Sequence, residues 1–311
     1  MKVLVSGIAG EIGFGIGRIL KRWGIFGELH GIDSSTDHPG ELLFDKCQKA
    51  PKASEEIYLD WLSKYISDHN IELFIPSSEA EIDTISKSKI LNIGNANILI
   101  NNSNLVATCL DKHETLDFLN SKGISVPDHG LVGINFPISF PLITKPRTGQ
   151  GGKGLSLIST LEEYESCDDG YVWQEMLTPA NEEYTCAVYV APSGKNRNLL
   201  MRRKLAGGFT QKGEVVDDPE IENYVKDIAK ALDFNGVINI QLRKTKLGPL
   251  LFEINPSLSS TLVFRDLMGF QDLRWWVADH LGMPKKDYIQ PKATTKFYRG
   301  ISEYILKATE G

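Results

Sequence analysis

The sequence is poor in the features that mark disulfide-stapled proteins and metal centres. It has four cysteines in 311 residues, and they lie far apart, at Cys47, Cys109, Cys167 and Cys186. Because no pair has the spacing of metal ligands, we expect reduced structural thiols. The six histidines show no HxxxH or HExxH pattern. The sequence therefore predicts no zinc site.

Long apolar runs and an excess of positive charge are also missing. No run of about 18 apolar residues occurs, as a membrane-spanning helix would need, and the first residues have the pattern of a strand, not of a signal peptide. The net charge of −6 argues against a general nucleic-acid-binding protein, which needs a basic surface. We expect a cytoplasmic protein without membrane or nucleic-acid partners, although a local basic site for a phosphorylated ligand stays open.

The length of 311 residues suits about two domains. From residue 1 to about 105, short apolar runs alternate with stretches of helical periodicity. This alternation predicts an α/β domain with a doubly wound parallel sheet, whose ligands lie beyond the carboxyl ends of the strands. The expected strands are 2–6, 28–33, 73–76 and 98–100, and the expected helices are 14–23 and 58–69.

The remaining residues, 106–311, predict a second domain with more strands than helices. Asp111 can cap a helix that ends at Gly123, and a further helix is expected at 221–232. The expected strands are 142–146, 155–158, 172–175, 184–190, 236–243 and 250–254, with a short helix at 161–164.

The most informative motif is LITKPRTGQGGKGL, in which a strand delivers Lys145 into a glycine-rich loop. Glycines let backbone N–H groups approach phosphate oxygens closely, and the lysine adds a cation beside the same oxygens. The order differs from a P-loop, because the lysine precedes the glycines. A hairpin whose glycines only form a turn is an equally good interpretation of this motif taken alone.

A second motif, LLFEINPSLSST, places Glu253 and Asn255 at alternate positions of a strand. Their side chains therefore point to one face, and Gln241 in NIQLR is expected beside them across the sheet. Such oxygen ligands suit Mg²⁺, which also takes phosphate oxygens. The alternative is a solvated strand face followed by an asparagine–proline turn, but a carboxylate in an apolar run needs a partner.

A third motif, VWQEMLTPANEEYTC, joins a strand that ends at Glu175 to an acidic segment with Glu182 and Glu183. An extended segment can hydrogen-bond the edge of a purine through its backbone, and a carboxylate can bind ribose hydroxyls. Taken alone, this stretch is more simply an exposed acidic loop.

The order of LDKHETLDFL, ITKPRTGQGGKG, VWQEML with EEYTC, and GVINIQLR with LLFEINPSLSST resembles that of ATP-grasp proteins. The resemblance covers roughly residues 1–265 and is strongest to the carbamoyl-phosphate-synthase-like branch, in a short single-module form. It implies a Rossmann-like pre-ATP-grasp domain at 1–105 and an α+β ATP-grasp domain at 106–311, with a mobile lid at about 115–175.

The resemblance also implies roles for individual residues. Lys112 and Lys145 would bind the phosphates of the nucleotide, together with the loop residues Gly149, Gly151 and Gly152. Glu175, with the backbone of Met176 and Leu177, would hold adenine. Glu183 would bind the ribose. Mg²⁺, or Mn²⁺ in its place, would be held by Gln241, Glu253 and Asn255. The catalytic cations would be Arg202, Arg203 or Lys204 near the transferred phosphate and Arg265 at a substrate carboxylate or phosphate.

One departure from the family concerns the residue after the Asn255–Pro256 pair. The family commonly has arginine there, and this chain has Ser257. This chain therefore lacks the cation that commonly contacts the acceptor or the phosphate; Arg265 could supply it, or the substrate could differ.

The opening stretch, GIAGEIGFGIG, offers a competing interpretation. Its GxxGxxG spacing and Asp33 also fit a dinucleotide-binding oxidoreductase, but the only YxxxK sequence contains Pro291 and does not suit a helix. The glycine turn is better explained by a helix that packs on its strand and offers its N-terminus to an anion of the acceptor substrate.

From the resemblance we expect an ATP- and Mg²⁺-dependent ligase that joins a carboxylate to an amine or thiol through an acylphosphate, as a homodimer in many relatives. A small-molecule kinase of the same fold and a non-catalytic ATP-binding regulator are the alternatives, and an NAD(P)-dependent oxidoreductase is the weakest.

Overall fold

In the computed structural model, which describes residues 1–90, 92–149, 154–179 and 182–300, the chain folds into two compact units. The first comprises Met1–Ser103, Ser257–Gln290 and residues 299–300. The second comprises Asn104–Pro256 and Pro291–Tyr298. The first unit thus takes up residues 257–290, which the sequence assigned to the domain 106–311.

A six-stranded sheet forms the centre of the first unit, with strand order β3-β2-β1-β4-β6-β5. All neighbours are parallel except β5 and β6. The sequence VLV within β1 is buried on both faces, as expected for a central parallel strand. The strands are β1 (Lys2–Ser6), β2 (Glu28–Asp33), β3 (Lys46–Lys49), β4 (Leu73–Ile75), β5 (Asn92–Ile93) and β6 (Ala96–Ile98).

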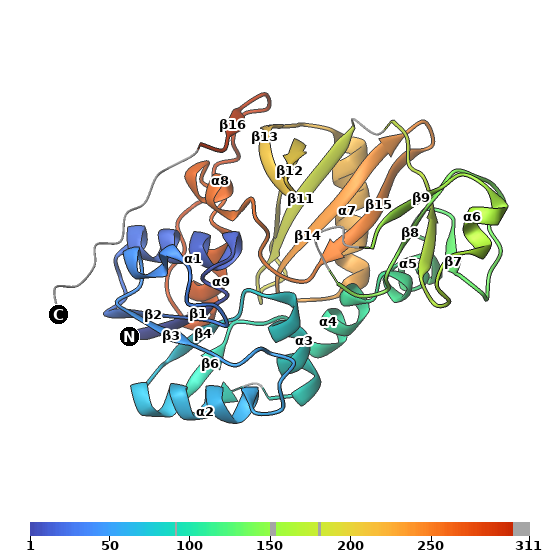
Figure 1. Ribbon diagram of the computed structural model, residues 1–311. Helices are drawn as coiled ribbons and strands as arrows, with labels where there is room; N and C mark the ends of the chain where they lie inside the picture. The colour runs from blue at the N-terminus through green and yellow to red at the C-terminus, as the bar shows by residue number, and fades with distance from the viewer. Residues whose placement is uncertain (91, 150–153, 180–181, 301–311) are drawn as a thin grey trace. The chain divides into compact units, whose positions relative to one another are not determined.

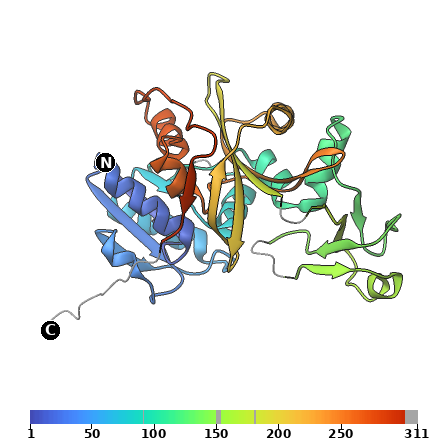
Figure 2. The same cartoon turned by 90° about the horizontal axis from the view of Figure 1, so that it is seen from above.

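Helices cover both faces of this sheet (Figure 1). Tyr58, Leu62 and Ile66 of α2 join Ile85 of α3 in a core under one face. Helix α1 lies along the other face (Figure 2) and packs against α8, a contact between segments far apart in the sequence. The helices are α1 (Glu11–Trp23), the 3₁₀ helix η1 (Pro39–Leu42), α2 (Tyr58–His69), α3 (Glu79–Ser88), α8 (Leu262–Leu267) and α9 (Asp272–His280).

The second unit contains a small antiparallel sheet with strand order β7-β10-β8-β9. Its core is built from Val132, Leu142, Ile158, Tyr164 and Trp173. The strands are β7 (His129–Leu131), β8 (Leu142–Lys145), β9 (Ser156–Ile158) and β10 (Val172–Glu175), with α4 (Ser103–Leu110) and α5 (Lys112–Ser121) before them and α6 (Leu161–Glu165) among them.

A larger antiparallel sheet, with order β15-β14-β11-β12-β13-β16, completes the second unit. Helix α7 (Pro219–Leu232) packs on one face through Ile221, Val225 and Ile228. Gly207 and Gly208 join β12 to β13 with φ of 60° and 83°, as a tight hairpin requires. The strands are β11 (Glu183–Val190), β12 (Asn196–Ala206), β13 (Phe209–Val215), β14 (Gly236–Thr245), β15 (Gly248–Asn255) and β16 (Lys296–Tyr298).

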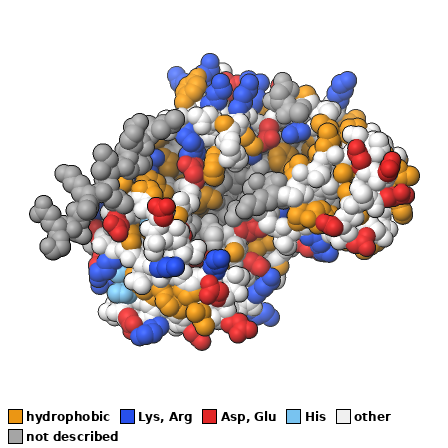
Figure 3. Space-filling model, viewed as in Figure 1, with side chains coloured by type: hydrophobic (Ala, Val, Ile, Leu, Met, Phe, Trp, Pro, Cys, Tyr) orange, Lys and Arg blue, Asp and Glu red, His pale blue; other side chains and the backbone are white. Residues whose placement is uncertain are grey.

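The charge distribution on the surface and the hydropathy of the helices agree with what the sequence predicts. On the face drawn in Figure 3, acidic and basic side chains are interspersed. In the described part of the chain, none of the helices is both long and apolar enough to cross a bilayer. The α/β fold class expected from the sequence is confirmed.

Candidate functional site

The two faces of the larger sheet of the second unit differ in chemistry. Even-numbered residues of β11 and β14, such as Cys186 and Ile240, point into the core beneath α7. The odd-numbered residues form the opposite face, where Gln241 lies directly across from both Thr185 and Glu253. Asn255 lies opposite Asn239 in the next row. The predicted placement of Gln241 beside Glu253 on one strand face is therefore found.

A β-bulge interrupts the pairing of β14 with β15 beside this row. Gln241 pairs with Glu253 and Leu242 pairs with Leu251, so Phe252 is the extra residue. Such an irregularity turns backbone groups out of the ladder. The carbonyl of Phe252 instead accepts a hydrogen bond of 2.9 Å from the Nζ of Lys145. The bulge thus holds the strand-end lysine against the sheet that carries Glu253.

Lys145 is a buried cation at the end of β8, with 8% of its surface exposed. Its ammonium also donates to Oε1 of Gln174 at 2.8 Å. Burial lowers the pKa of Lys145 to about 8, against an opposing effect of the Glu253 carboxylate and with a smaller further lowering by Lys112. The lysine is thus fixed in place before any ligand arrives, and its charge is only partly stabilised by the protein.

Lys112 lies at the first position of α5, which Asp111 caps through the N–H groups of His113 and Glu114. Its Nζ donates to the carbonyl oxygen of Gly149 at 2.5 Å, and Arg147 donates from both Nε and Nη2 to Oδ2 of Asp111. Both predicted phosphate lysines therefore flank the start of the glycine loop. The predicted loop residues Gly151 and Gly152 lie outside the described residues.

The Mg²⁺ ligands predicted from the sequence are three oxygen donors on one face. Among the described residues, no hydrogen bond or ion pair engages the Glu253 carboxylate or the Asn255 amide. The Gln241 oxygen, by contrast, accepts a hydrogen bond of 2.6 Å from Nη2 of Arg203. Carboxylate and amide oxygens fit Mg²⁺, so Glu253 and Asn255 suit it directly, whereas Gln241 would have to give up its arginine.

Of the three candidate cations on β12, Arg203 is the one that lies on this face. It donates from Nε to Oε1 of Glu183 at 2.9 Å, and Arg243 approaches the other oxygen of Glu183 at 3.7 Å. Arg202 and Lys204 alternate with Arg203 along β12 and point to the opposite face, where Arg202 pairs with Glu214. The two-residue alternation of side chains along a strand could have selected Arg203 from its neighbours in the sequence. Arg243 was not identified from the sequence.

The segment predicted to bind adenine uses several backbone groups within the protein. The N–H of Glu175 donates to the carbonyl of Asp128 at 2.8 Å. The carbonyl of Leu177 accepts from Nη1 of Arg243 at 2.7 Å. Met176 follows in the same extended segment, and its N–H reaches the carbonyl of Pro141 at 3.4 Å. Contacts of Glu175, Met176 and Leu177 with adenine, and of Glu183 with ribose, stay predictions.

Arg265 belongs to the first unit and is only 1% exposed. Its guanidinium donates twice to Oδ2 of Asp272, at 3.1 and 2.7 Å, and also to the hydroxyls of Ser259 and Thr261. With its donors engaged in this buried network, Arg265 is fitted to hold α8 to α9. The structure therefore does not favour the predicted contact with substrate.

The opening glycines serve packing. Gly7 has a φ of +62°, and a Cβ on Gly13 would lie 2.3 Å from the carbonyl oxygen of Gly7. Gly15 is where α8 approaches, since its Cβ would meet Leu262 at 3.1 Å. The N–H of Ala9 in the turn donates to Oδ2 of Asp33 at 2.9 Å. The protein's own carboxylate thus occupies a donor that a bound anion would use.

Comparisons with known proteins agree with this fold. Residues 173–299 match the model of a family described as ATP-grasp in the biosynthetic pathway with Ter operon. The search among curated proteins produced no match.

Several solved structures resemble the chain. N5-carboxyaminoimidazole synthetase from Staphylococcus aureus complexed with ADP is 16% identical, with a TM-score of 0.70 over 92% of this chain and 78% of that chain. N5-carboxyaminoimidazole ribonucleotide synthetase from Thermotoga maritima is 16% identical, with a TM-score of 0.69 over 94% and 78%. The biotin carboxylase domain of Hydrogenobacter thermophilus 2-oxoglutarate carboxylase is 14% identical, with a TM-score of 0.71 over 93% and 71%.

At these identities the solved structures establish a shared fold alone, and none of the comparisons singles out the carbamoyl-phosphate-synthase-like branch. Residues 173–299 match an ATP-grasp family model, and the described sheets give the chain the fold of these solved structures, so the chain is similar to ATP-grasp proteins, as the order of its motifs predicted.

Proposed function

We propose that the protein is an ATP- and Mg²⁺-dependent ligase that activates a carboxylate as an acylphosphate and transfers the acyl group to an amine or thiol. A carboxylate oxygen attacks the γ-phosphorus of ATP, and the bond to the β,γ-bridging oxygen breaks to release ADP. The amine nitrogen or thiol sulfur then attacks the acyl carbon and loses a proton, and phosphate leaves with the electron pair of the C–O bond.

One observation carries this proposal: Lys145 is held by the bulge carbonyl of Phe252 beside the strand that presents Glu253 and Asn255. A cation and a set of hard oxygen donors are thereby fixed in one place without an obvious nucleophile. Phosphoryl transfer requires this combination, because its catalysis consists mainly of positioning and charge neutralisation. The fold neighbours support ATP as the nucleotide, since the S. aureus synthetase was solved with ADP and the H. thermophilus domain with MgADP and bicarbonate.

In this proposal each group has a defined task. Lys145 and Lys112 bind the phosphates, with the amides of the loop that begins at Gly149. Mg²⁺ on Glu253 and Asn255, or Mn²⁺ in its place, neutralises charge on the phosphate oxygens. Of the three candidates Arg202, Arg203 and Lys204, we assign the role near the transferred phosphate to Arg203, because it alone of the three lies on the face of Glu253.

The lid and the partners follow from the same reaction. Closure of residues at about 115–175 would exclude water, which otherwise hydrolyses an acylphosphate. Ser257 supplies no cation and Arg265 is engaged elsewhere, so the substrate carboxylate is bound by other groups. A homodimer is also proposed, and the H. thermophilus domain was solved as a dimer.

The test uses hydroxylamine as a general amine, so that the natural acceptor need not be known. The full chain is incubated with MgATP, hydroxylamine and a panel of carboxylates that includes bicarbonate and amino acids. The proposal predicts ADP and, for organic acids, a hydroxamate in equal amounts. A stable phosphoester without hydroxamate would indicate a kinase. ATP binding without turnover across the panel would indicate a regulator, and binding of NAD alone an oxidoreductase.

A further inference from the structure

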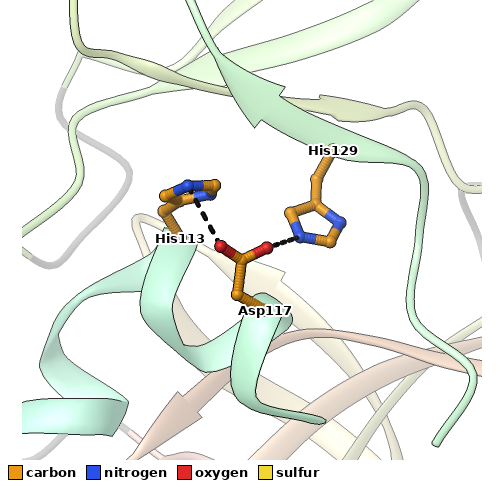
Figure 4. Close-up of side chains that lie close together, drawn as sticks. All are labelled: His113, Asp117 and His129. Atoms are coloured by element: carbon orange, nitrogen blue, oxygen red, sulfur yellow. Dashed lines mark hydrogen bonds and ion pairs between the residues drawn. The ribbon is translucent and has the colours of Figure 1, made fainter. Parts of the chain in front are cut away.

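Two histidines and an aspartate gather in the second unit outside the proposed nucleotide site. His113 and Asp117 lie one turn apart on α5, and His129 begins β7. Both rings point at the same carboxylate (Figure 4), with Nε2 of His113 at 3.3 Å from Oδ2 and Nε2 of His129 at 3.0 Å from Oδ1. One nitrogen from each ring and a carboxylate oxygen lie within 4.8 Å of one another.

The hydrogen-bonding groups around His129 require an electrophile at its Nε2. Its Nδ1 lies 2.8 Å from the carbonyl oxygen of Pro127, which can only accept, so Nδ1 carries a hydrogen. In the neutral ring Nε2 is then a lone pair, and it faces another acceptor, the Asp117 carboxylate. Only an added proton or a metal ion makes this contact attractive. A backbone carbonyl on Nδ1 is also the usual partner that orients a metal-binding histidine.

His113 adds a second unexplained atom. Its Nε2 faces the carboxylate, whereas its Nδ1 is buried without a hydrogen-bond partner among the described residues. The His113 side chain is 14% exposed and that of His129 7%, but Asp117 is 54% exposed. The group is therefore sheltered on the side of the rings and open to solvent on the side of the carboxylate, which gives an ion a path of entry.

From these contacts we propose that His113, Asp117 and His129 form a binding site for one divalent transition-metal ion of the zinc class. Two imidazoles and a carboxylate suit Zn²⁺ better than Mg²⁺, which prefers oxygen donors. Ligand atoms around a tetrahedral zinc lie about 3.3 Å apart. The two ring nitrogens lie 3.0 and 3.3 Å from different oxygens of Asp117, and with one ligand atom from each residue the three atoms lie within 4.8 Å of one another. Solvent would complete the coordination at the exposed side.

The ion would join two elements that carry parts of the nucleotide site. Helix α5 begins with Lys112, next to His113, and β7 pairs with β10, whose last residue is Glu175. The neighbouring cation, Arg147, is paired with Asp111 and Glu114, so its charge is balanced at the N-terminus of α5. The site is thus distinct from the proposed Mg²⁺ ligands Glu253 and Asn255, and it does not depend on the proposed function.

The test is metal titration of the chelator-treated full-length protein with Co²⁺ and Zn²⁺, without nucleotide. We expect one Co²⁺ per chain with the visible absorption of tetrahedral coordination, displaced by one Zn²⁺ and unaffected by excess Mg²⁺. His113→Gln and His129→Gln should each weaken Zn²⁺ binding by about a hundredfold or more, since each removes a ligand and loss of an outer-shell partner alone typically costs about 10–100-fold. His280→Gln, at a histidine outside the cluster, is the matched control and should bind as the unchanged protein does.

Circular dichroism and melting temperature show whether each variant is folded, and Asp117→Asn provides a third variant with little change of shape. Binding of less than one ion per chain, or equal binding by His129→Gln and the unchanged protein, would overturn the site. In that case the cluster is an ion pair in which a protonated His129 takes the place of the metal. ATP binding is measured separately, so failure of this site leaves the proposed ligase untouched.

Discussion

The chain uses glycine-rich segments twice, and the two serve opposite physical needs. In the first unit a Cβ on Gly13 would lie 2.3 Å from the backbone oxygen of Gly7, and one on Gly17 would lie 2.5 Å from the ring of Phe44. These glycines are there because backbone and helix must approach closely. At Gly149 in the second unit, no described heavy atom lies within 4 Å of the Cβ position, and φ is +103°. That glycine is there for its conformation beside a cation. In this chain the glycines with close neighbours serve packing, whereas Gly149 lies in open space beside Lys112.

The largest expected effect is a loss of activity without a loss of stability, on mutation of the proposed Mg²⁺ ligand Glu253 near the open glycine segment. Glu253→Gln should lower Mg²⁺-dependent turnover by about three orders of magnitude, or about 4 kcal/mol of transition-state stabilisation. The melting temperature should change little, because among the described residues no hydrogen bond or ion pair engages the Glu253 carboxylate. Steady-state ADP release measures the effect. Glu214→Gln, on the opposite face of the same sheet, is the control, and persistent activity of Glu253→Gln would remove this residue from the metal site.

The second effect is a loss of stability without a direct effect on the proposed nucleotide site, on mutation of the close-packed glycine segment. Gly13→Ala should lower the free energy of unfolding by about 3 kcal/mol, because the methyl group would meet the fixed backbone of Gly7 and Ser6. Urea unfolding measures the change. Gly10→Ala, whose Cβ would lie 3.3 Å from the nearest atom, should cost less than half as much. Equal stability of both variants would show that the close approach in α1 is not required.

Lys145→Met should weaken ATP binding by about tenfold to a hundredfold, as expected for loss of a hydrogen bond to a charged group. Stability should change little, because removal of a buried charge offsets the two lost hydrogen bonds. Calorimetric titration with MgATP measures the affinity. Lys204→Met is the matched control, since Lys204 lies exposed on the other face, and an equal loss there would contradict the assignment of faces in β12.

The pH dependence should separate the two roles of the Lys145 charge. Its pKa of about 8 in the folded protein lies below that of an unfolded lysine, about 10.4. ATP affinity should therefore fall as pH rises above 8. Over the window from pH 8 to about 10.4, the contribution of Lys145 to stability should rise, because the unfolded chain still binds the proton. Titrations and melting curves from pH 7 to 10 test both trends, and Lys145→Met should abolish them.

The smallest effect is expected for Gly149→Ala. A side chain at φ of +103° is strained, at a cost of about 1 kcal/mol, but it meets no described atom. ATP affinity should fall a fewfold with little loss of stability. A melting temperature as low as that of Gly13→Ala would break the contrast between the two segments.

The sequence predicted the elements with strong local patterns. Strands β1 and β2 and helix α2 have the predicted bounds, and Glu253 and Gln241 are neighbours because alternation and hairpin order fix them. Other features depend on contacts between distant segments. The packing of α8 on α1 is indicated in the sequence only by Gly15, which has no side chain. The bulge at Phe252, whose carbonyl accepts a hydrogen bond from Lys145, has no sequence signature.

One miss and one open choice had a usable signal. The missed hairpin of β12 and β13 surrounds Gly207 and Gly208, a pair typical of tight turns. Period-two alternation along β12 selects Arg203 from the three candidates Arg202, Arg203 and Lys204. The His113–Asp117–His129 cluster was overlooked because only two of its members share a helix. The third comes from β7, whose register against α5 is a tertiary property.

The central claim is that the site around Lys145 and Glu253 binds ATP with Mg²⁺, and calorimetric titration of the unchanged protein tests it most directly. ATP, ADP and NAD are each titrated with and without Mg²⁺. The account predicts Mg²⁺-dependent binding of ATP and ADP, weakened in Lys145→Met, and no binding of NAD. Binding of NAD alone, or ATP binding unaffected by Mg²⁺ and by Lys145→Met, would contradict it.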